Sequence, residues 1–226
     1  MKKFSFIVLL MLMVDSAFGA DAGGSNFDKF FMAGGPLVWV VLLPLSLVTV
    51  SIIVQMFISI TRSKLIPSKT VAGIRDMLAN NQLGTAANAM DNDNSMLARV
   101  LKTGIDESCN GRAAMDTAMI EMLEQDSTSL MRKIEWLNMI GNVAPMVGLF
   151  GTVWGMIDAF NGIVQAGGQP DVPDLAKGIS TALVTTWWGM AVAIPALASY
   201  GILRNKIDNL AAETAVTAEQ LLHKVK

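Results

Sequence analysis

Three long stretches of the chain carry almost no charged side chain. Residues 36–60 and 178–203 contain none, and residues 136–166 contain only Asp158. Each stretch is longer than the roughly 20 apolar residues that a helix needs to cross the hydrocarbon layer of a bilayer. The pattern predicts an all-α integral membrane protein with three transmembrane helices.

A shorter apolar run stands at the N-terminus. Residues 4–14 follow Lys2 and Lys3 and are too few to span a bilayer. Small residues fit cleavage after Gly19 or after Ala22, so we interpret residues 1–22 as a cleaved signal peptide. Residues 23–35 are then a short periplasmic segment, and the alternative is an uncleaved segment at the membrane interface.

The basic residues are distributed unevenly around the three spans. The segment from Arg62 to Lys133 holds nine Lys and Arg, and the tail after Leu203 holds four more, against Lys29 and Lys177 on the opposite side. Basic residues favour the cytoplasmic side. We therefore expect the N-terminus outside, residues 61–135 and 204–226 as cytoplasmic helical regions, the C-terminus inside, and residues 167–177 as a periplasmic loop.

Long helices are expected to extend from the spans into the cytoplasm. From Arg112 onward no strong helix breaker occurs before Gly141, and apolar residues recur every three to four positions. They are Met115, Ala118, Met119, Met122, Leu123, Leu130 and Ile134. This spacing predicts one helix that continues from Arg112 into the second span.

Composition agrees with this picture and excludes several functions. Hydrophobic residues make up 52% of the chain and charged residues 16%, where soluble domains carry about 25% charged residues. Seventeen Lys and Arg against 19 Asp and Glu leave no broad basic surface for nucleic acid. With only Cys109 and His223 available, the chain offers no zinc site or Cys/His nucleophile. We expect no cofactor and no enzymatic activity.

Small residues form a stripe on each of the last two spans. At 100° per residue, the stripe of the second span covers about 120°. It contains Gly148, Gly151, Thr152, Gly155, Asp158, Ala159 and Gly162. The third span matches it with Gly178, Thr181, Ala182, Thr185, Thr186, Gly189, Ala193, Ala196 and Ser199. Such stripes let helices pack closely in lipid, or they line a narrow lumen.

Few groups in the spans suit ion transport. Thr152, Thr181, Thr185 and Thr186 offer hydroxyls to their own helices, to water or to a carboxylate, but they carry no charge. Asp158 lies near the outer boundary of its span and fits an interfacial carboxylate or a relay equally well. If the chain lacks the main pore carboxylate, a partner must supply it.

Two prolines interrupt the spans. Pro145 and Pro195 each remove a backbone hydrogen bond and predict a bend in the helix. The sequence does not distinguish a static kink from a moving hinge.

Two motifs resemble those of the MotA/TolQ/ExbB proton channel family. They are APMVGLFGTVWGMIDAF at residues 144–160 and GISTALVTTWWGMAVAIPA at residues 178–196. Chain size and the modest cytoplasmic part resemble ExbB and TolQ more than MotA. The resemblance implies a bacterial inner-membrane homo-pentamer around two copies of a single-span partner of the ExbD or TolR kind, whose membrane aspartate carries the proton. A TonB-like or TolA-like protein would act next, with outer-membrane transport as the process that is powered.

The resemblance also assigns roles to particular residues. By motif match, Thr152 and Thr186 are the threonines that face the aspartate of the partner. Many relatives carry a glutamate at the position of Thr181, so the coupling ion, proton or sodium, stays open. Trp187 and Trp188 also replace the small or aliphatic residues that are usual there.

The sequence is also compatible with three other functions. The first is a non-conducting oligomeric scaffold, in which the stripes serve only assembly. The second is a TolQ-like role in envelope integrity. The third is a self-sufficient transporter that uses Asp158.

Overall fold

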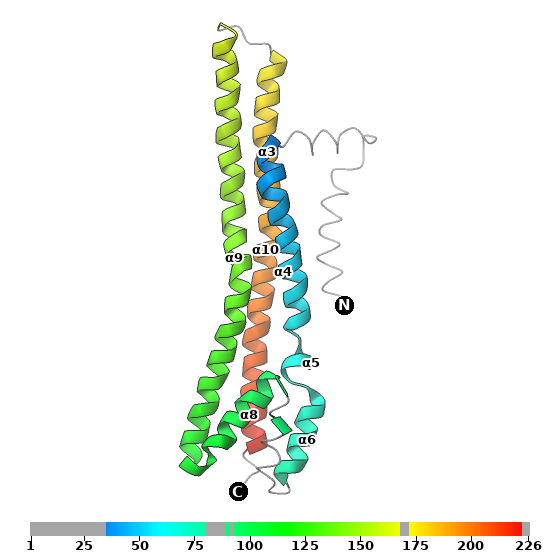
Figure 1. Ribbon diagram of the computed structural model, residues 1–226, viewed down its shortest axis with the longest axis vertical. Coiled ribbons are helices and arrows are strands. Elements are labelled where there is room, and N and C mark those ends of the chain that lie inside the picture. The colour runs from blue at the N-terminus through cyan, green and yellow to red at the C-terminus, as the bar shows by residue number, and fades with distance from the viewer. Residues whose placement is uncertain (1–34, 80–88, 91–92, 168–171, 223–226) are drawn as a thin grey trace. The chain divides into compact units, whose positions relative to one another are not determined.

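The computed structural model describes residues 35–79, 89–90, 93–167 and 172–222 (Figure 1). The expected signal peptide and most of the segment after it lie outside these residues. Every regular element in the described residues is a helix. Three helices are long and apolar enough to cross a membrane: Gly35–Ser59, Arg112–Gln165 and Leu175–Leu222. The described residues thus contain the three long apolar helices that the expectation of three spans requires.

The first span is built from three consecutive helical segments. They are α3 (Gly35–Leu37), the π-helical η1 (Val38–Leu42) and α4 (Leu43–Ser59). One face of this span is buried, with residues three to seven positions apart along the helix. Its buried residues are Val38, Leu42, Thr49, Ile53, Met56 and Ile60. Thr49 Oγ1 donates to the carbonyl of Leu45 at 2.7 Å, which satisfies the one polar group on this face.

The single helix predicted from Arg112 is confirmed. Helix α9 runs without interruption over Arg112–Gln165, 54 residues, which is about 81 Å at 1.5 Å per residue. It continues through Pro145. Helix α10 (Val172–Leu222) is equally continuous and contains Pro195, so the third apolar stretch and the tail after it are one helix.

Helix α10 begins earlier than the apolar stretch on which its span was predicted. It starts at Val172, within the stretch expected to form the loop after the second span. Pro173 is compatible with this start, because a proline in the first turn removes an N–H that has no partner inside the helix.

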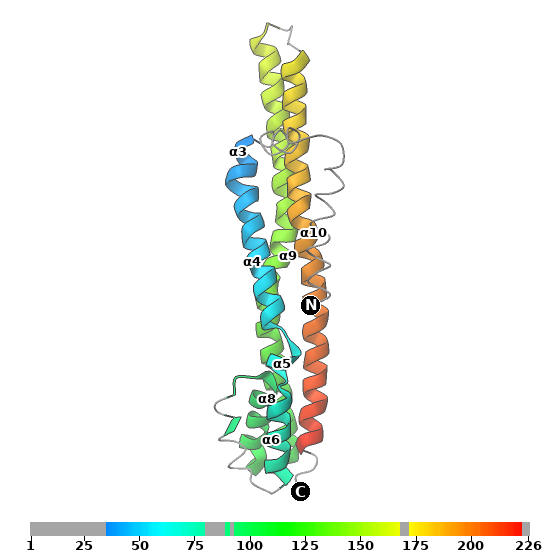
Figure 2. The same ribbon diagram turned by 90° about the vertical axis from the view of Figure 1, so that its right-hand side faces the viewer.

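The structure divides into two compact units. Of the described residues, the first contains those within 35–51 and 137–198, and the second contains those within 52–136 and 199–222. In the first unit α9 and α10 run side by side, as both views show (Figures 1 and 2). Many large apolar side chains of this unit are exposed, among them Leu149, Trp154 and Phe160 at 61%, 65% and 58%. Such a surface suits contact with lipid or with other subunits.

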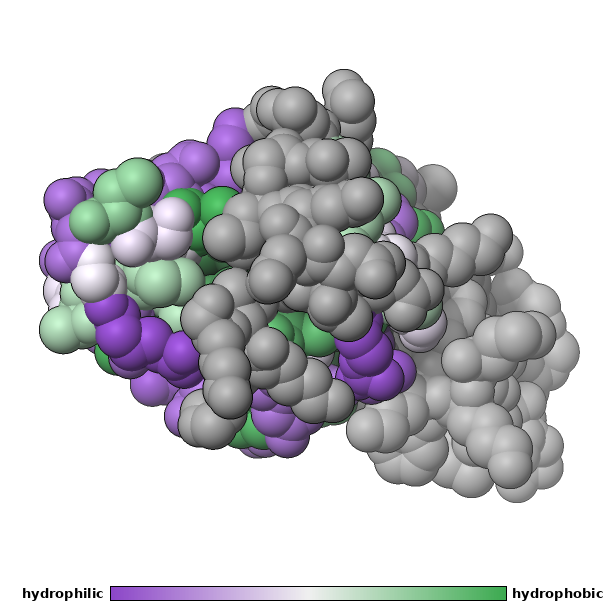
Figure 3. All heavy atoms as spheres, turned by 90° about the horizontal axis from the view of Figure 1, so that it is seen from below, coloured by the Kyte–Doolittle hydropathy of each residue, from purple (hydrophilic) through white to green (hydrophobic). Residues whose placement is uncertain are grey.

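The second unit has a core of its own. Besides parts of the long helices it contains α5 (Arg62–Leu65), α6 (Ser68–Ala79), α8 (Met96–Asp106) and the 3-10 helix η2 (Glu107–Asn110). Helix α8 buries Met96, Leu97 and Leu101, and its Gly104 approaches Met119 of α9 and Leu222 of α10. Seen from below, the visible described residues are hydrophilic in some places and hydrophobic in others (Figure 3).

Candidate functional site

Glycines bring the spans of α9 and α10 close together. A Cβ atom on Gly148 would lie 3.0 Å from the carbonyl oxygen of Thr185, and one on Gly189 would lie 2.7 Å from the carbonyl oxygen of Ala144. Both obstacles are backbone atoms, which cannot swing aside as the end of a flexible side chain can. The two helices therefore lie at a separation that requires glycine at these positions.

The same close contact continues along α9, but not to every glycine of the predicted stripe. A Cβ atom on Gly151 would lie 2.5 Å from Thr185 Oγ1, and one on Gly155 would lie 3.0 Å from the Cβ of Ala182. At Gly162 no atom of the described residues lies within 4 Å of the added Cβ. Gly162 is thus open within the part of the chain that the structure describes, whereas the other four predicted packing glycines lie in the contact.

Thr185 belongs to the interior of this contact. Its side chain is 2% exposed, and its hydroxyl lies 2.7 Å from the carbonyl oxygen of Ala182 and 3.3 Å from that of Gly148. The first bond lies within α10 and the second crosses to α9. The geometry therefore gives Thr185 a packing role inside the single chain.

Thr186, the next residue, is less enclosed. Its hydroxyl donates to the carbonyl oxygen of Gly148 at 3.3 Å, and the residue is half-buried. The carbonyl of Gly148 is thereby approached by two hydroxyls from α10. Of the two adjacent threonines, only Thr186 keeps a substantial part of its surface accessible.

Thr152 and Thr181 are also partly exposed, and each donates within its own helix. Thr152 Oγ1 donates to the carbonyl of Leu149 at 2.7 Å, and Thr181 Oγ1 donates to that of Lys177 at 3.0 Å. A hydroxyl whose proton is engaged in this way still has lone pairs that accept a hydrogen bond. Thr152, Thr181 and Thr186 therefore offer acceptor oxygens to an incoming group.

Asp158 lies beyond Thr152, toward the end of α9. It lies six residues after Thr152, about 9 Å further along α9, and its side chain is exposed. Within the described part of the chain it makes no hydrogen bond or ion pair. The carboxylate is thus available to water or to another molecule.

The two tryptophans at the departure from the family pattern contact each other. The rings of Trp187 and Trp188 meet edge to face, with centroids 5.3 Å apart and planes at 87°. Both side chains are half-buried. The pair occupies α10 directly after Thr186 and gives this turn a bulky, rigid surface.

In the second unit polar contacts join α10 to earlier helices. Tyr200 donates its hydroxyl to Glu135 Oε2 at 3.3 Å, and Arg62 Nε donates to Glu213 Oε1 at 2.8 Å. The hydrogen bond from Arg62 lowers the pKa of the Glu213 carboxyl. No periodic signal in the sequence points to Tyr200 as the partner of Glu135.

A buried carboxylate joins α8 to α9. Asp126 is 5% exposed and lies 2.9 Å from Arg99 Nη2 of α8. Burial raises the pKa of Asp126, and the charges of Arg99 and Lys133 oppose that rise. Sequence reasoning missed this residue, although Asp126 falls at the apolar spacing of Met119, Met122 and Leu130.

A second carboxylate organises the start of α8. Thr70 of α6 donates to Asp93 Oδ2 at 2.6 Å, and the backbone N–H of Ser95 donates to Asp93 Oδ1 at 2.9 Å. Burial acts to raise the pKa of Asp93, but these hydrogen bonds outweigh it and hold the pKa below its usual range. Ser95 in turn caps α8 by accepting from the N–H of Ala98.

The fold resembles that of a protein of known structure. The structure of MotAB from C. jejuni aligns with a TM-score of 0.61 and 16% sequence identity, over 97% of this chain and 86% of that one. At this identity the likeness concerns the fold.

Sequence comparisons are more specific. The biopolymer transport protein ExbB of Neisseria meningitidis serogroup A is 29% identical over 210 residues, which cover 87% of this chain and 95% of the relative. The Tol-Pal system protein TolQ of Haemophilus influenzae is 37% identical over 95 residues, 42% of this chain and 40% of the relative. Residues 92–215, more than half of the chain, match the MotA/TolQ/ExbB proton channel family. The chain belongs to the MotA/TolQ/ExbB proton channel family.

Proposed function

We propose that the chain is the pore-lining subunit of an inner-membrane stator complex that the proton-motive force drives. Five copies surround a single-span partner of the ExbD or TolR kind, and the complex powers transport at the outer membrane. The N-terminus lies in the periplasm and the second unit lies in the cytoplasm. Membership of a proton channel family supports the proposal, as does the likeness of most of the chain to ExbB.

One observation carries the proposal. The contact between α9 and α10 has three partly exposed threonines along it, Thr152, Thr181 and Thr186. The apolar stretches that form it, residues 136–166 and 178–203, contain one carboxylate, Asp158, which lies beyond Thr152 toward the end of α9. Proton transfer through hydrocarbon requires an ionisable group. A proton-conducting complex built on these spans therefore takes its carboxylate from a partner.

The threonine geometry suggests what happens to that carboxylate. All three hydroxyls already donate to backbone carbonyls, so their free capacity is as acceptors. A protonated carboxylic acid has an O–H to donate and is well matched to such oxygens. A charged carboxylate can only accept hydrogen bonds, so it needs a donor. These hydroxyls can donate to it only after they rotate away from the backbone carbonyls. The threonines thus stabilise the neutral, proton-carrying form of the partner at this level of the membrane.

Isosteric substitutions test this role. We expect Thr152→Val and Thr186→Val to lower proton flux at least tenfold in vesicles that contain the complex purified with its partner. The serine variants, which keep the hydroxyl, should retain most of the flux. Thr49→Val is the matched control, because Thr49 is bonded to Leu45 on the first span. Wild-type flux in correctly assembled Val variants would contradict the proposal.

The main alternative is a non-conducting scaffold. Its support is that each of the four threonines bonds to a backbone carbonyl within the chain. The scaffold predicts that a deletion phenotype does not depend on the proton gradient. A protonophore that reproduces the deletion defect in wild-type cells would exclude it, and a protonophore without such an effect would favour it.

A TolQ-like role in envelope integrity is the alternative within the same mechanism. The match to TolQ of Haemophilus influenzae supports it over part of the chain. The two roles differ in the partner, so the identity of the co-purifying single-span protein decides between them.

A further inference from the structure

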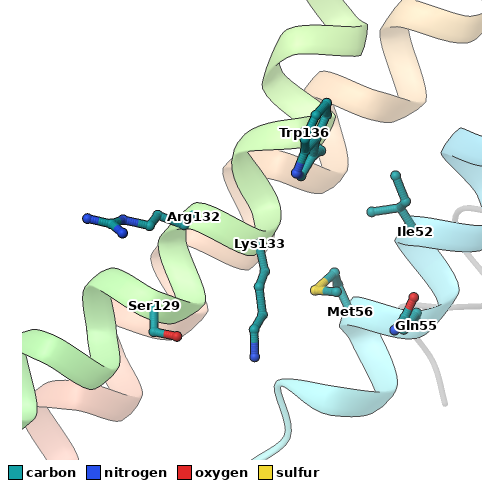
Figure 4. Close-up of a pocket in the computed structure, with 7 residues that line it drawn as sticks. All are labelled: Ile52, Gln55, Met56, Ser129, Arg132, Lys133 and Trp136. Carbon is teal, nitrogen blue, oxygen red and sulfur yellow. The ribbon is translucent and has the colours of Figure 1, made fainter.

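A groove lies between α4 and α9 in the second unit (Figure 4). Its volume is about 510 Å³. Ile52, Gln55 and Met56 line it from α4, and α9 contributes a polar stretch that ends at Trp136. The groove is therefore apolar on one wall and polar on the other.

The polar wall carries positive charge. Lys133 extends from α9 into the space between the helices, next to Met56, whereas Arg132 points away from α4 at the edge of the groove (Figure 4). Among the described residues neither side chain forms an ion pair; the charge of Lys133 acts on the nearby Asp126, but the ion pair of Asp126 is with Arg99. Ser129 and Gln55 add groups that donate hydrogen bonds. This combination suits an anion that has several acceptor oxygens.

The groove also lies where the apolar stretches of both helices end. Helix α4 contains no charged residue, and Arg62 follows it at the start of α5. The apolar part of α9 starts at Trp136, directly after a cluster of charged residues. Tryptophan and basic residues at such a boundary occupy the headgroup level of a bilayer. This placement does not depend on which side of the membrane the groove faces.

We propose that the groove binds the phosphodiester headgroup of an anionic phospholipid. Lys133 is the main cation, Gln55 and Ser129 donate to the phosphate oxygens, and Arg132 contributes from the edge. Basic pockets between membrane helices bind anionic headgroups in this way. The site is distinct from the threonines of the first unit and does not depend on proton conduction.

The apolar wall favours a lipid over a free phosphate ion. Ile52 and Met56 offer no hydrogen bonds to an inorganic ion, but they suit the glycerol and first methylene groups of a lipid. Trp136 is 59% exposed at the end of the groove, and the next turns of α9 expose Met139 and Val143 at 52% and 48%. Acyl chains therefore have an apolar path along α9 from the headgroup.

Native mass spectrometry of the full-length protein in detergent tests the site. The protein is titrated with phosphatidylglycerol or with phosphatidylcholine, and bound lipids are counted. Lys133→Gln should weaken phosphatidylglycerol binding about fivefold, because one cation near an anionic headgroup contributes about that factor. Lys133→Arg should retain binding. The matched control is Arg204→Gln, which removes an exposed cation just after the third span, outside the groove.

Four outcomes would overturn the proposal. The first is equal loss in Lys133→Gln and Arg204→Gln, which indicates unspecific charge attraction. The second is no preference for phosphatidylglycerol over phosphatidylcholine. The third is displacement of the lipid by excess inorganic phosphate, which assigns the groove to the free ion. The fourth comes from a photo-crosslinking residue placed at position 55 instead of Gln55. A crosslink from this residue to a second copy of the chain, and not to lipid, would overturn the proposal. A crosslink to phosphatidylglycerol supports the proposal.

Discussion

At the scale of single residues, the glycines of the α9–α10 contact are not equivalent. An added Cβ at Gly189 meets a backbone carbonyl at 2.7 Å, whereas one at Gly162 meets no described residue within 4 Å. The sequence stripe placed both glycines on packing faces, because a helical wheel reports direction and not the distance to a neighbour. Their different surroundings give a direct test of the contact.

We expect Gly189→Ala to destabilise the protein by about 1–3 kcal/mol, the usual range for overpacking. The helices must separate, since the carbonyl of Ala144 cannot move independently of α9. Thermal unfolding in detergent, followed by circular dichroism, measures the change. Gly162→Ala is the matched control and should be neutral or slightly stabilising. Equal melting temperatures for both variants would show that the contact is looser than described.

The hydrogen bonds of Asp93 predict an acid dependence. Because its pKa is lowered in the folded protein, the stabilisation is present above the ordinary Asp pKa of about 4 and is lost as the pH falls through the lower, folded value. We expect Asp93→Ala to cost about 1–3 kcal/mol at neutral pH, with a smaller difference below pH of about 4. Urea unfolding at several pH values tests this, with Asp106→Ala as the exposed control.

At the scale of elements, α8 is held to α9 by packing and by the Arg99–Asp126 pair. Periodicity predicted the apolar face of α9, but it did not predict that a carboxylate shares this face. The carboxylate of Asp126 can be buried on this face only because Arg99 of α8 pairs with it. Thr185 and Thr186 show the same limit, because they are sequence neighbours on one predicted face and only packing makes Thr185 the buried one.

Removing only one partner of this pair should be costly. We expect Arg99→Gln to destabilise the protein by about 1–3 kcal/mol, because Asp126 is then buried without its cation. The double variant Arg99→Gln/Asp126→Asn should recover most of the loss, and a double-mutant cycle from chemical unfolding measures the coupling. Asp116→Asn, in the exposed pair with Arg112, is the control and should change stability by less than about 0.5 kcal/mol. Additive losses in the cycle would argue against a specific pair.

At the scale of the whole molecule, the three apolar spans and the long helix from Arg112 followed from hydropathy and periodicity, because both are strong over many residues. The continuity of α10 from Val172 to Leu222 was harder to predict, since its composition changes from apolar to charged within one helix. Which helix faces meet, and which threonines stay accessible, depends on distances that the sequence does not contain. How the chain assembles with other chains likewise depends on distances that the sequence does not contain.

The central claim is that copies of this chain surround a partner that supplies the carboxylate. Native mass spectrometry of the tagged protein, extracted mildly from its own membranes, tests it most directly by giving copy number and co-purifying chains together. We predict five copies with two of a small single-span protein that has an aspartate in its membrane segment. A homo-oligomer that never retains such a partner, under conditions that preserve a known complex of the family, would contradict the account and favour the scaffold.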